Sequence, residues 1–200
     1  MEAFSDGVFA IAITLLVLDL AVPNLSNYAV LDGLVKQWPA YLAYVVSFAA
    51  IGGAWISHTT ITEYLESANA LLLRLNLLLL FFVSIMPFPT HMLITYGLSS
   101  NAERLAVTLY GLNLLAISAI TILLWRYAVA EQFIKRDTPE DAVRGVTAKL
   151  QPSIAFYGAT VVIGLLVPVV AVILYLTIGF FLLIPFRAVF HHVRRWSGSG

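Results

Sequence analysis

The sequence predicts an all-α integral membrane protein with six transmembrane helices in each subunit. Hydrophobic residues make up 60% of the 200 residues, charged residues only 11%, and the mean hydropathy is +0.91. Such a chain is far more apolar than a soluble domain. Apolar runs of about 20 residues, long enough to span a bilayer, recur along it. The basic residues gather in alternate connections between these runs.

The first four spans are separated by short polar connections. The first begins at Phe4 and stops before Pro23. It lacks the basic leader and small-residue cleavage pattern of a secretory signal, so we expect it to be retained. Pro39 suits the first turn of the second span. Pro87 and Pro89 are expected to end the third span, because proline interrupts a helix.

The last apolar run, residues 154–184, is too long for one span, so Pro168 is expected to mark a tight turn between two. Between residues 131 and 151 we expect a short cytoplasmic helix with Thr138 as its N-cap and Pro139 at its first position. One domain covers residues 1–196, and the final SGSG, residues 197–200, is typical of a linker. The predicted spans are approximately 4–22, 39–58, 70–89, 104–127, 152–167 and 169–186.

The basic residues predict the orientation, because cytoplasmic loops hold an excess of Lys and Arg. Six spans leave only Lys36 and Arg104 on one side. The other side receives Arg74, Arg126, Lys135, Arg136, Arg144, Lys149, Arg187, Arg194 and Arg195. Both termini are therefore expected in the cytoplasm. His191 and His192 lie in the basic tail, where contact with lipid phosphate is favoured over metal binding.

Polar groups within the predicted spans are few, which narrows the function classes. An enzyme inside the bilayer needs several acids or histidines at one depth. A proton-coupled transporter needs a carboxylate near the midplane, whereas Asp6 and Asp19 both lie near the ends of the first span. A channel needs neither. A secondary transporter, with a site near the broken end of the third span or the Pro168 turn, is the alternative.

One face of the first span carries Ile11, Leu15 and Leu18, with Thr14 beside them, because residues spaced i, i+4 and i+7 align on a helix. Several copies around an axis would bring these side chains together as a hydrophobic constriction. The alternative is an ordinary apolar stripe, with the Thr14 hydroxyl bonded to its own helix.

Polar residues of three spans share one depth near the cytoplasmic end. Asp6 lies at the start of the first span, Trp55 and His58 at the end of the second, and Asn76 early in the third. We therefore expect these side chains to meet. The alternatives are a helix-start acid at Asp6, favoured by the helix dipole, and an interfacial histidine at His58.

Two segments resemble the transmembrane protein 175 family of lysosomal and bacterial potassium channels, which lack a glycine-tyrosine-glycine filter. They are FSDGVFAIAITLLVLDL, residues 4–20, and LNLLLLFFVSIMPFPT, residues 75–90. The resemblance implies a homotetramer in which the first helix of each subunit lines a central pore. It also implies a bacterial plasma membrane location, potassium as the permeant ion, no cofactor or resident metal, and other copies and lipids, not nucleic acid, as partners.

The resemblance also implies roles for particular residues. The pore constriction is assigned to Ile11, Thr14, Leu15 and Leu18. A structural polar network is assigned to Phe4, Ser5, Asp6, Trp55, His58 and Asn76. The family pattern has an arginine four residues before the phenylalanine, a position that precedes Met1, and Arg74 is the alternative base for Asp6. Because a wide hydrophobic pore cannot replace a full hydration shell, only modest selectivity over sodium is expected.

Overall fold

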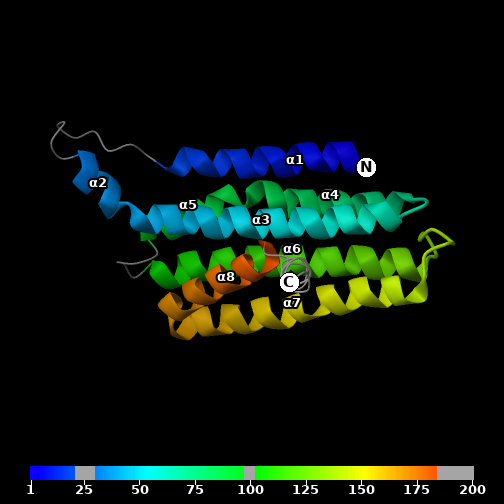
Figure 1. The fold of residues 1–200 in the computed structure, drawn as a ribbon. Helices are drawn as coiled ribbons and strands as arrows, with labels where there is room; N and C mark the ends of the chain where they lie inside the picture. Colours follow the sequence, from blue (N-terminus) through cyan, green and yellow to red (C-terminus); the bar gives the residue numbers. More distant parts are fainter. Residues whose placement is uncertain (21–29, 97–101, 184–200) are drawn as a thin grey trace, which may run out of the picture.

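The computed structural model describes residues 1–20, 30–96 and 102–183 of the chain. Within these ranges the secondary structure is helical, apart from one isolated antiparallel bridge between Leu65 and Ile134. Long helices lie side by side in alternating directions (Figure 1). In chain order the elements are α1 (Glu2–Leu15), the 3₁₀ helix η1 (Leu16–Asp19), α2 (Val30–Lys36), α3 (Trp38–Tyr64), α4 (Ala70–Ile85), α5 (Pro87–Tyr96), α6 (Glu103–Ala130), α7 (Glu140–Leu166) and α8 (Pro168–Leu183).

The all-α prediction is confirmed for the described residues, and 4 stretches among them are long and apolar enough to cross a membrane. These are α3, the stretch from Ala70 to Tyr96 that contains α4 and α5, α6, and α7. The helix α1 has 14 residues, and α8 has 16 up to Leu183, where the described residues end; both are fewer than the roughly 20 residues of a full span. The total of six spans therefore stays a prediction.

The predicted separation of a short cytoplasmic helix from a fifth span beginning at residue 152 is wrong. A single helix of 27 residues, α7, contains Pro152 in its interior. Proline removes one backbone hydrogen bond but has a φ angle compatible with a helix, so the remaining bonds carry the helix through it. The N-cap is Pro139, not Thr138.

The prediction that Pro87 and Pro89 end the third span is also wrong, because α5 begins at Pro87 and continues to Tyr96. One residue, Met86, separates α4 from α5, and its φ of −50° and ψ of −36° are helical. Proline is well tolerated in the first turn of a helix, where its missing N–H is not needed. The prolines therefore interrupt the hydrogen bonding without ending the span.

A side chain of α6 satisfies one of the carbonyls that this interruption frees. The Met86 N–H donates to the Val83 carbonyl at 3.1 Å, which leaves the Phe82 carbonyl without its usual helical donor. Asn113 of α6 donates its side-chain amide to the Phe82 carbonyl at 3.1 Å. Such substitutes are required in a bilayer, where no water pairs with the backbone.

The two ends of the bundle differ in their number of basic residues. The N-terminus lies at the same end as the α3–α4 and α6–α7 connections, and α2 lies at the opposite end (Figure 1). Lys36 and Arg104 belong to the α2 end. The basic residues in or near the N-terminal end are Arg74, Arg126, Lys135, Arg136, Arg144 and Lys149. Pro23, His191, His192 and residues 197–200 lie outside the described residues.

The central helix α6 contacts α4 and α5 on one side and α7 and α8 on the other. At Gly111 it lies against side chains of α7 and α8 without room for a side chain of its own. A Cβ added there would lie 2.8 Å from Cγ2 of Val161 and would collide with the hydroxyl of Tyr175. The Tyr175 ring is buried and contacts Tyr110, with 5.2 Å between ring centroids. Only glycine therefore allows this packing.

We expect Gly111→Ala to lower the free energy of unfolding by about 1–3 kcal/mol, because overpacking must displace α7 or α8. The thermal unfolding midpoint of the purified protein in detergent measures this effect. Gly158→Ala in α7 is the matched control, because a Cβ there meets nothing within 4 Å. Equal midpoints for the two variants would contradict the prediction.

Candidate pore helix and its buried support

The helix α1 has one buried face and one exposed face. Its buried side chains are Ser5, Phe9 and Ala12, and α1 packs against α3 and α4. The residues predicted to form the constriction all lie on the exposed face: Ile11 is 60% exposed, Leu15 42% and Leu18 74%, and Thr14 is also exposed. The single chain thus leaves a continuous apolar surface on its first helix without a partner among the described residues.

The hydroxyl of Thr14 bonds to its own helix, as the alternative reading of the sequence allows. It donates to the Ile11 carbonyl at 2.9 Å. A hydroxyl oxygen also has two lone pairs that accept hydrogen bonds or contact a cation. The donated proton therefore leaves the oxygen of Thr14 able to face water or a cation on the exposed side.

The buried side of α1 is held by a chain of hydrogen bonds from three helices. Nε2 of His58 in α3 lies 2.7 Å from Oδ1 of Asn76 in α4. Nδ2 of Asn76 donates to the hydroxyl of Ser5 in α1 at 3.0 Å. That hydroxyl donates to the Met1 carbonyl at 3.0 Å. Ser5 and His58 are completely buried, and Asn76 is 2% exposed.

The donors and acceptors in this chain have one consistent direction. Because Oδ1 of Asn76 is an acceptor, Nε2 of His58 must carry a proton. Among the described residues, Nδ1 of His58 has no hydrogen-bond partner. The ring of His58 also contacts Phe9, with 5.5 Å between centroids. His58 therefore donates to Asn76 of α4 and packs against Phe9 of α1.

The other residues assigned to the network are arranged differently. The Trp55 indole donates to Oδ1 of Asp6 at 2.8 Å, at an exposed position. Within the described residues no ion pair joins Arg74 to Asp6. Phe4 is 62% exposed and does not enter the network. Consecutive helical residues point about 100° apart, so Phe4 cannot share the inward direction of Ser5.

A contact at the far end of α1 was missed by the sequence analysis. Nδ1 of His91 in α5 lies 2.8 Å from Oδ1 of Asp19 at the end of η1. Because the predicted third span ends at Pro89, His91 falls outside every helix predicted from the sequence. The first helix and η1 are thus tied to the bundle near both ends.

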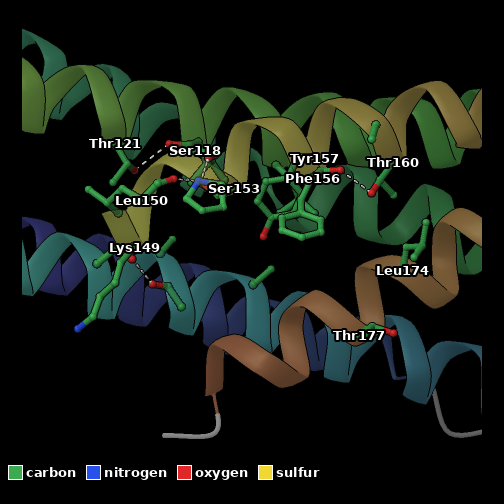
Figure 2. A pocket seen from close by; sticks show the side chains of 18 of the residues that line it. Ser118, Thr121, Lys149, Leu150, Ser153, Phe156, Tyr157, Thr160, Leu174 and Thr177 are labelled. Carbon is green, nitrogen blue, oxygen red and sulfur yellow. Dashed lines mark hydrogen bonds between the residues drawn. The ribbon is translucent and has the colours of Figure 1, made fainter. Parts of the chain in front are cut away.

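A separate cavity of about 630 Å³ lies between α3, α6, α7 and α8 (Figure 2). Its wall is apolar apart from a few hydroxyls, two of which, on Ser118 and Ser153, lie 2.5 Å apart. Of the described residues that line it, Lys149 alone is charged, and none belongs to α1. The cavity is therefore not part of the candidate pore, and it offers no carboxylate for a coupled transporter.

We expect Asn76→Leu to destabilise the protein by about 1–3 kcal/mol, because it leaves the buried Nε2–H of His58 without an acceptor, whereas the Ser5 hydroxyl keeps its bond to the Met1 carbonyl. Thermal unfolding in detergent measures the loss. Trp55→Phe is the comparison, because it removes a hydrogen bond at an exposed position and should cost less than Asn76→Leu. A larger loss in Trp55→Phe would show that the exposed pair, and not the buried chain, anchors α1.

Comparisons with known proteins agree with this architecture. Residues 1–87 match the family described as endosomal/lysosomal potassium channel TMEM175. A Chryseobacterium protein named potassium channel is 33% identical over 193 residues, 94% of this chain and 94% of that protein. A Streptomyces collinus protein of the same description is 44% identical over 126 residues, but the match covers only 62% of this chain and 61% of that protein.

A solved structure is similar along nearly the whole chain. It is the crystal structure of a lysosomal potassium-selective channel TMEM175 homologue from Chamaesiphon minutus, with a TM-score of 0.79 and 31% identity. The superposition covers 90% of this chain and 93% of that one. The matched proteins are described as channels, not enzymes, and a channel needs no cofactor. The resemblance seen in residues 4–20 and 75–90 is therefore confirmed, and the chain belongs to the TMEM175 family.

Proposed function

We propose that four copies of this chain form a potassium-selective cation channel in which the α1 helices surround a central pore. In this proposal Ile11, Leu15 and Leu18 form a hydrophobic constriction, and Thr14 contributes hydroxyls beside it. One observation carries the proposal: the exposed face of α1 is apolar over its length while its opposite face is fixed by buried hydrogen bonds. The potassium channel descriptions of its relatives supply the ion.

Each subunit is proposed to cross the membrane six times, with α1 and η1 as the first span and α8 as the beginning of the sixth. Both termini would then lie in the cytoplasm of a bacterium whose plasma membrane holds the channel. The concentration of basic residues at the N-terminal end supports this orientation, because positive residues are retained on the cytoplasmic side. The bacterial sources of the similar channels support the location.

Conduction would be passive flow along the shared axis. Rings of branched aliphatic side chains limit the wetting of a narrow pore, so small changes in its width switch ion flow. Thr14 hydroxyls would replace part of the lost water around a cation. Because four hydroxyls cannot replace a complete hydration shell, the preference for potassium over sodium would be modest.

The buried chain from His58 to Ser5 would act as the support of the pore. It touches no ion, but it determines which side chains of α1 face away from the bundle. Secondary transport is less well supported, since the cavity beside α7 and α8 lacks a carboxylate among its described lining residues. Saturable uptake coupled to an ion gradient would favour that alternative.

Ion flux into liposomes containing the purified protein tests the proposal. The parent protein should pass potassium faster than sodium. Leu15→Ala should raise the flux or reduce that preference, because it widens the constriction and makes it easier to wet. A dye-based assay with potassium or sodium as the permeant ion, together with native mass spectrometry for the tetramer, measures both properties.

The matched control is Leu123→Ala on α6. Leu123 is 52% exposed, close to the 42% of Leu15, but lies on another helix, so it should leave flux and selectivity unchanged. A lipid-facing α1 would show the same exposure as a pore helix. If Leu15→Ala and Leu123→Ala behave alike in folded protein, α1 faces lipid and the proposed pore is wrong.

A further inference from the structure

Phe4 is an exposed aromatic residue on the face of α1 that holds the constriction residues. It is 62% exposed, and its ring has no aromatic partner among the described residues. Ile11 follows seven residues later, so the two side chains lie on one face of the helix. At about 1.5 Å per residue, their levels differ by roughly 10 Å.

The face between these two levels carries little side-chain volume. Gly7 lies between Phe4 and Ile11, it is exposed, and a Cβ added there meets nothing within 4 Å. In an assembly with the α1 helices around the axis, the pore would therefore be wide at the level of Gly7. The Phe4 rings would bound this wide part toward the N-terminus, and the Ile11 side chains would bound it on the opposite side. A wide compartment next to aromatic rings suits an ion larger than potassium.

The direction of Phe4 is set by the residues that follow it. Ser5 is completely buried and bonded to Asn76, and Asp6 accepts the indole N–H of Trp55. Both hydrogen bonds are made by the residues that follow Phe4 in the chain, and Phe4 makes neither of them. The hydrogen bonds of Ser5 and Asp6 thus hold the phenyl ring of Phe4 on the exposed face of α1.

Two acidic residues of α1 lie near this level. Glu2 and Asp6 lie in the first turns of α1, and neither belongs to a salt bridge among the described residues. Their carboxylates oppose the positive end of the helix dipole, which otherwise repels cations. In a tetramer these acids would lie at the level of the four phenyl rings but on the bundle side of α1, about 200° around the helix from Phe4.

We propose that the Phe4 rings of four subunits form a binding site for organic cations of the quaternary ammonium class at the N-terminal mouth of the pore. The inference rests on the proposed function, since it requires α1 to line the pore. A cation within about 6 Å of an aromatic face is attracted by the ring quadrupole, and quaternary ammonium groups are recognised in this way. Such a cation, held above the constriction, blocks potassium flow.

Tetraethylammonium block of potassium current in inside-out patches tests the proposal. The proposed orientation turns the N-terminal mouth toward the bath, so the compound should block from the bath and not from the pipette. Phe4→Leu keeps an apolar side chain but removes the quadrupole, and should raise the half-blocking concentration about tenfold. Phe4→Trp should lower it, because indole binds cations best.

Phe88→Leu is the matched control, because Phe88 is also 64% exposed but lies on α5, at the opposite end of the bundle. It should leave the block unchanged. If Phe4→Leu fails to conduct, Phe4→Trp and Phe4→Tyr carry the test, and block that is unaltered in both overturns the inference.

The outcomes separate the two proposals. A parent that passes potassium, with block insensitive to Phe4 or equal from both sides, overturns the aromatic site and leaves the channel intact. A parent without potassium current, in a protein that is folded and inserted, overturns the channel itself. Side-specific block that weakens in Phe4→Leu and strengthens in Phe4→Trp supports both.

Discussion

The rotation of α1 about its own axis depends on hydrogen bonds, because apolar packing in a bilayer does not fix it. Lipid tails are as apolar as leucine, so an aliphatic face gains little by turning toward protein instead of lipid. The bonds from His58 through Asn76 to Ser5 distinguish the faces. Any rotation that turned Ile11 inward would leave these polar groups unpaired where no water reaches them. The exposed face of α1 is thus selected by Ser5, His58 and Asn76, none of which lies on it.

The need to pair polar groups where no water reaches them also explains why some helix ends predicted from the sequence are wrong. Proline rules describe the loss of one local hydrogen bond, and they led to the predicted end of the third span at Pro87 and Pro89. In a bilayer, ending a helix exposes several backbone groups, whereas continuing it leaves only one or two to be paired by neighbours. Asn113 provides such a partner from a helix more than twenty residues away in the chain, and that contact cannot be deduced from the residues around the proline.

The polar support of α1 was more predictable than its surroundings. Once the spans have directions, His58 and Asn76 fall at the depth where the first span begins, and buried polar groups at one depth pair with each other. Ser5 was assigned to the network only through the family resemblance. Phe4 was grouped with them because it is adjacent in a motif, but adjacency along a helix means a different face. The Asp19 contact with His91 depended on α5 continuing past Pro89, so the error in the helix end concealed it.

The 3₁₀ helix η1 changes the geometry of the exposed apolar face of α1 at the end where Leu15 and Leu18 lie. Residues three apart are eclipsed in a 3₁₀ helix, whereas in an α-helix they are staggered by about 60°. Leu18 lies within η1, and Leu15 directly precedes it, so the two side chains are brought toward a common line parallel to the axis. In a fourfold arrangement, the four Leu15 side chains and the four Leu18 side chains would superpose when viewed along the pore axis. The constriction between the Leu15 and Leu18 levels would then be straight and not helically twisted. Its length would be roughly 6 Å, because three residues of a 3₁₀ helix rise about 2.0 Å each.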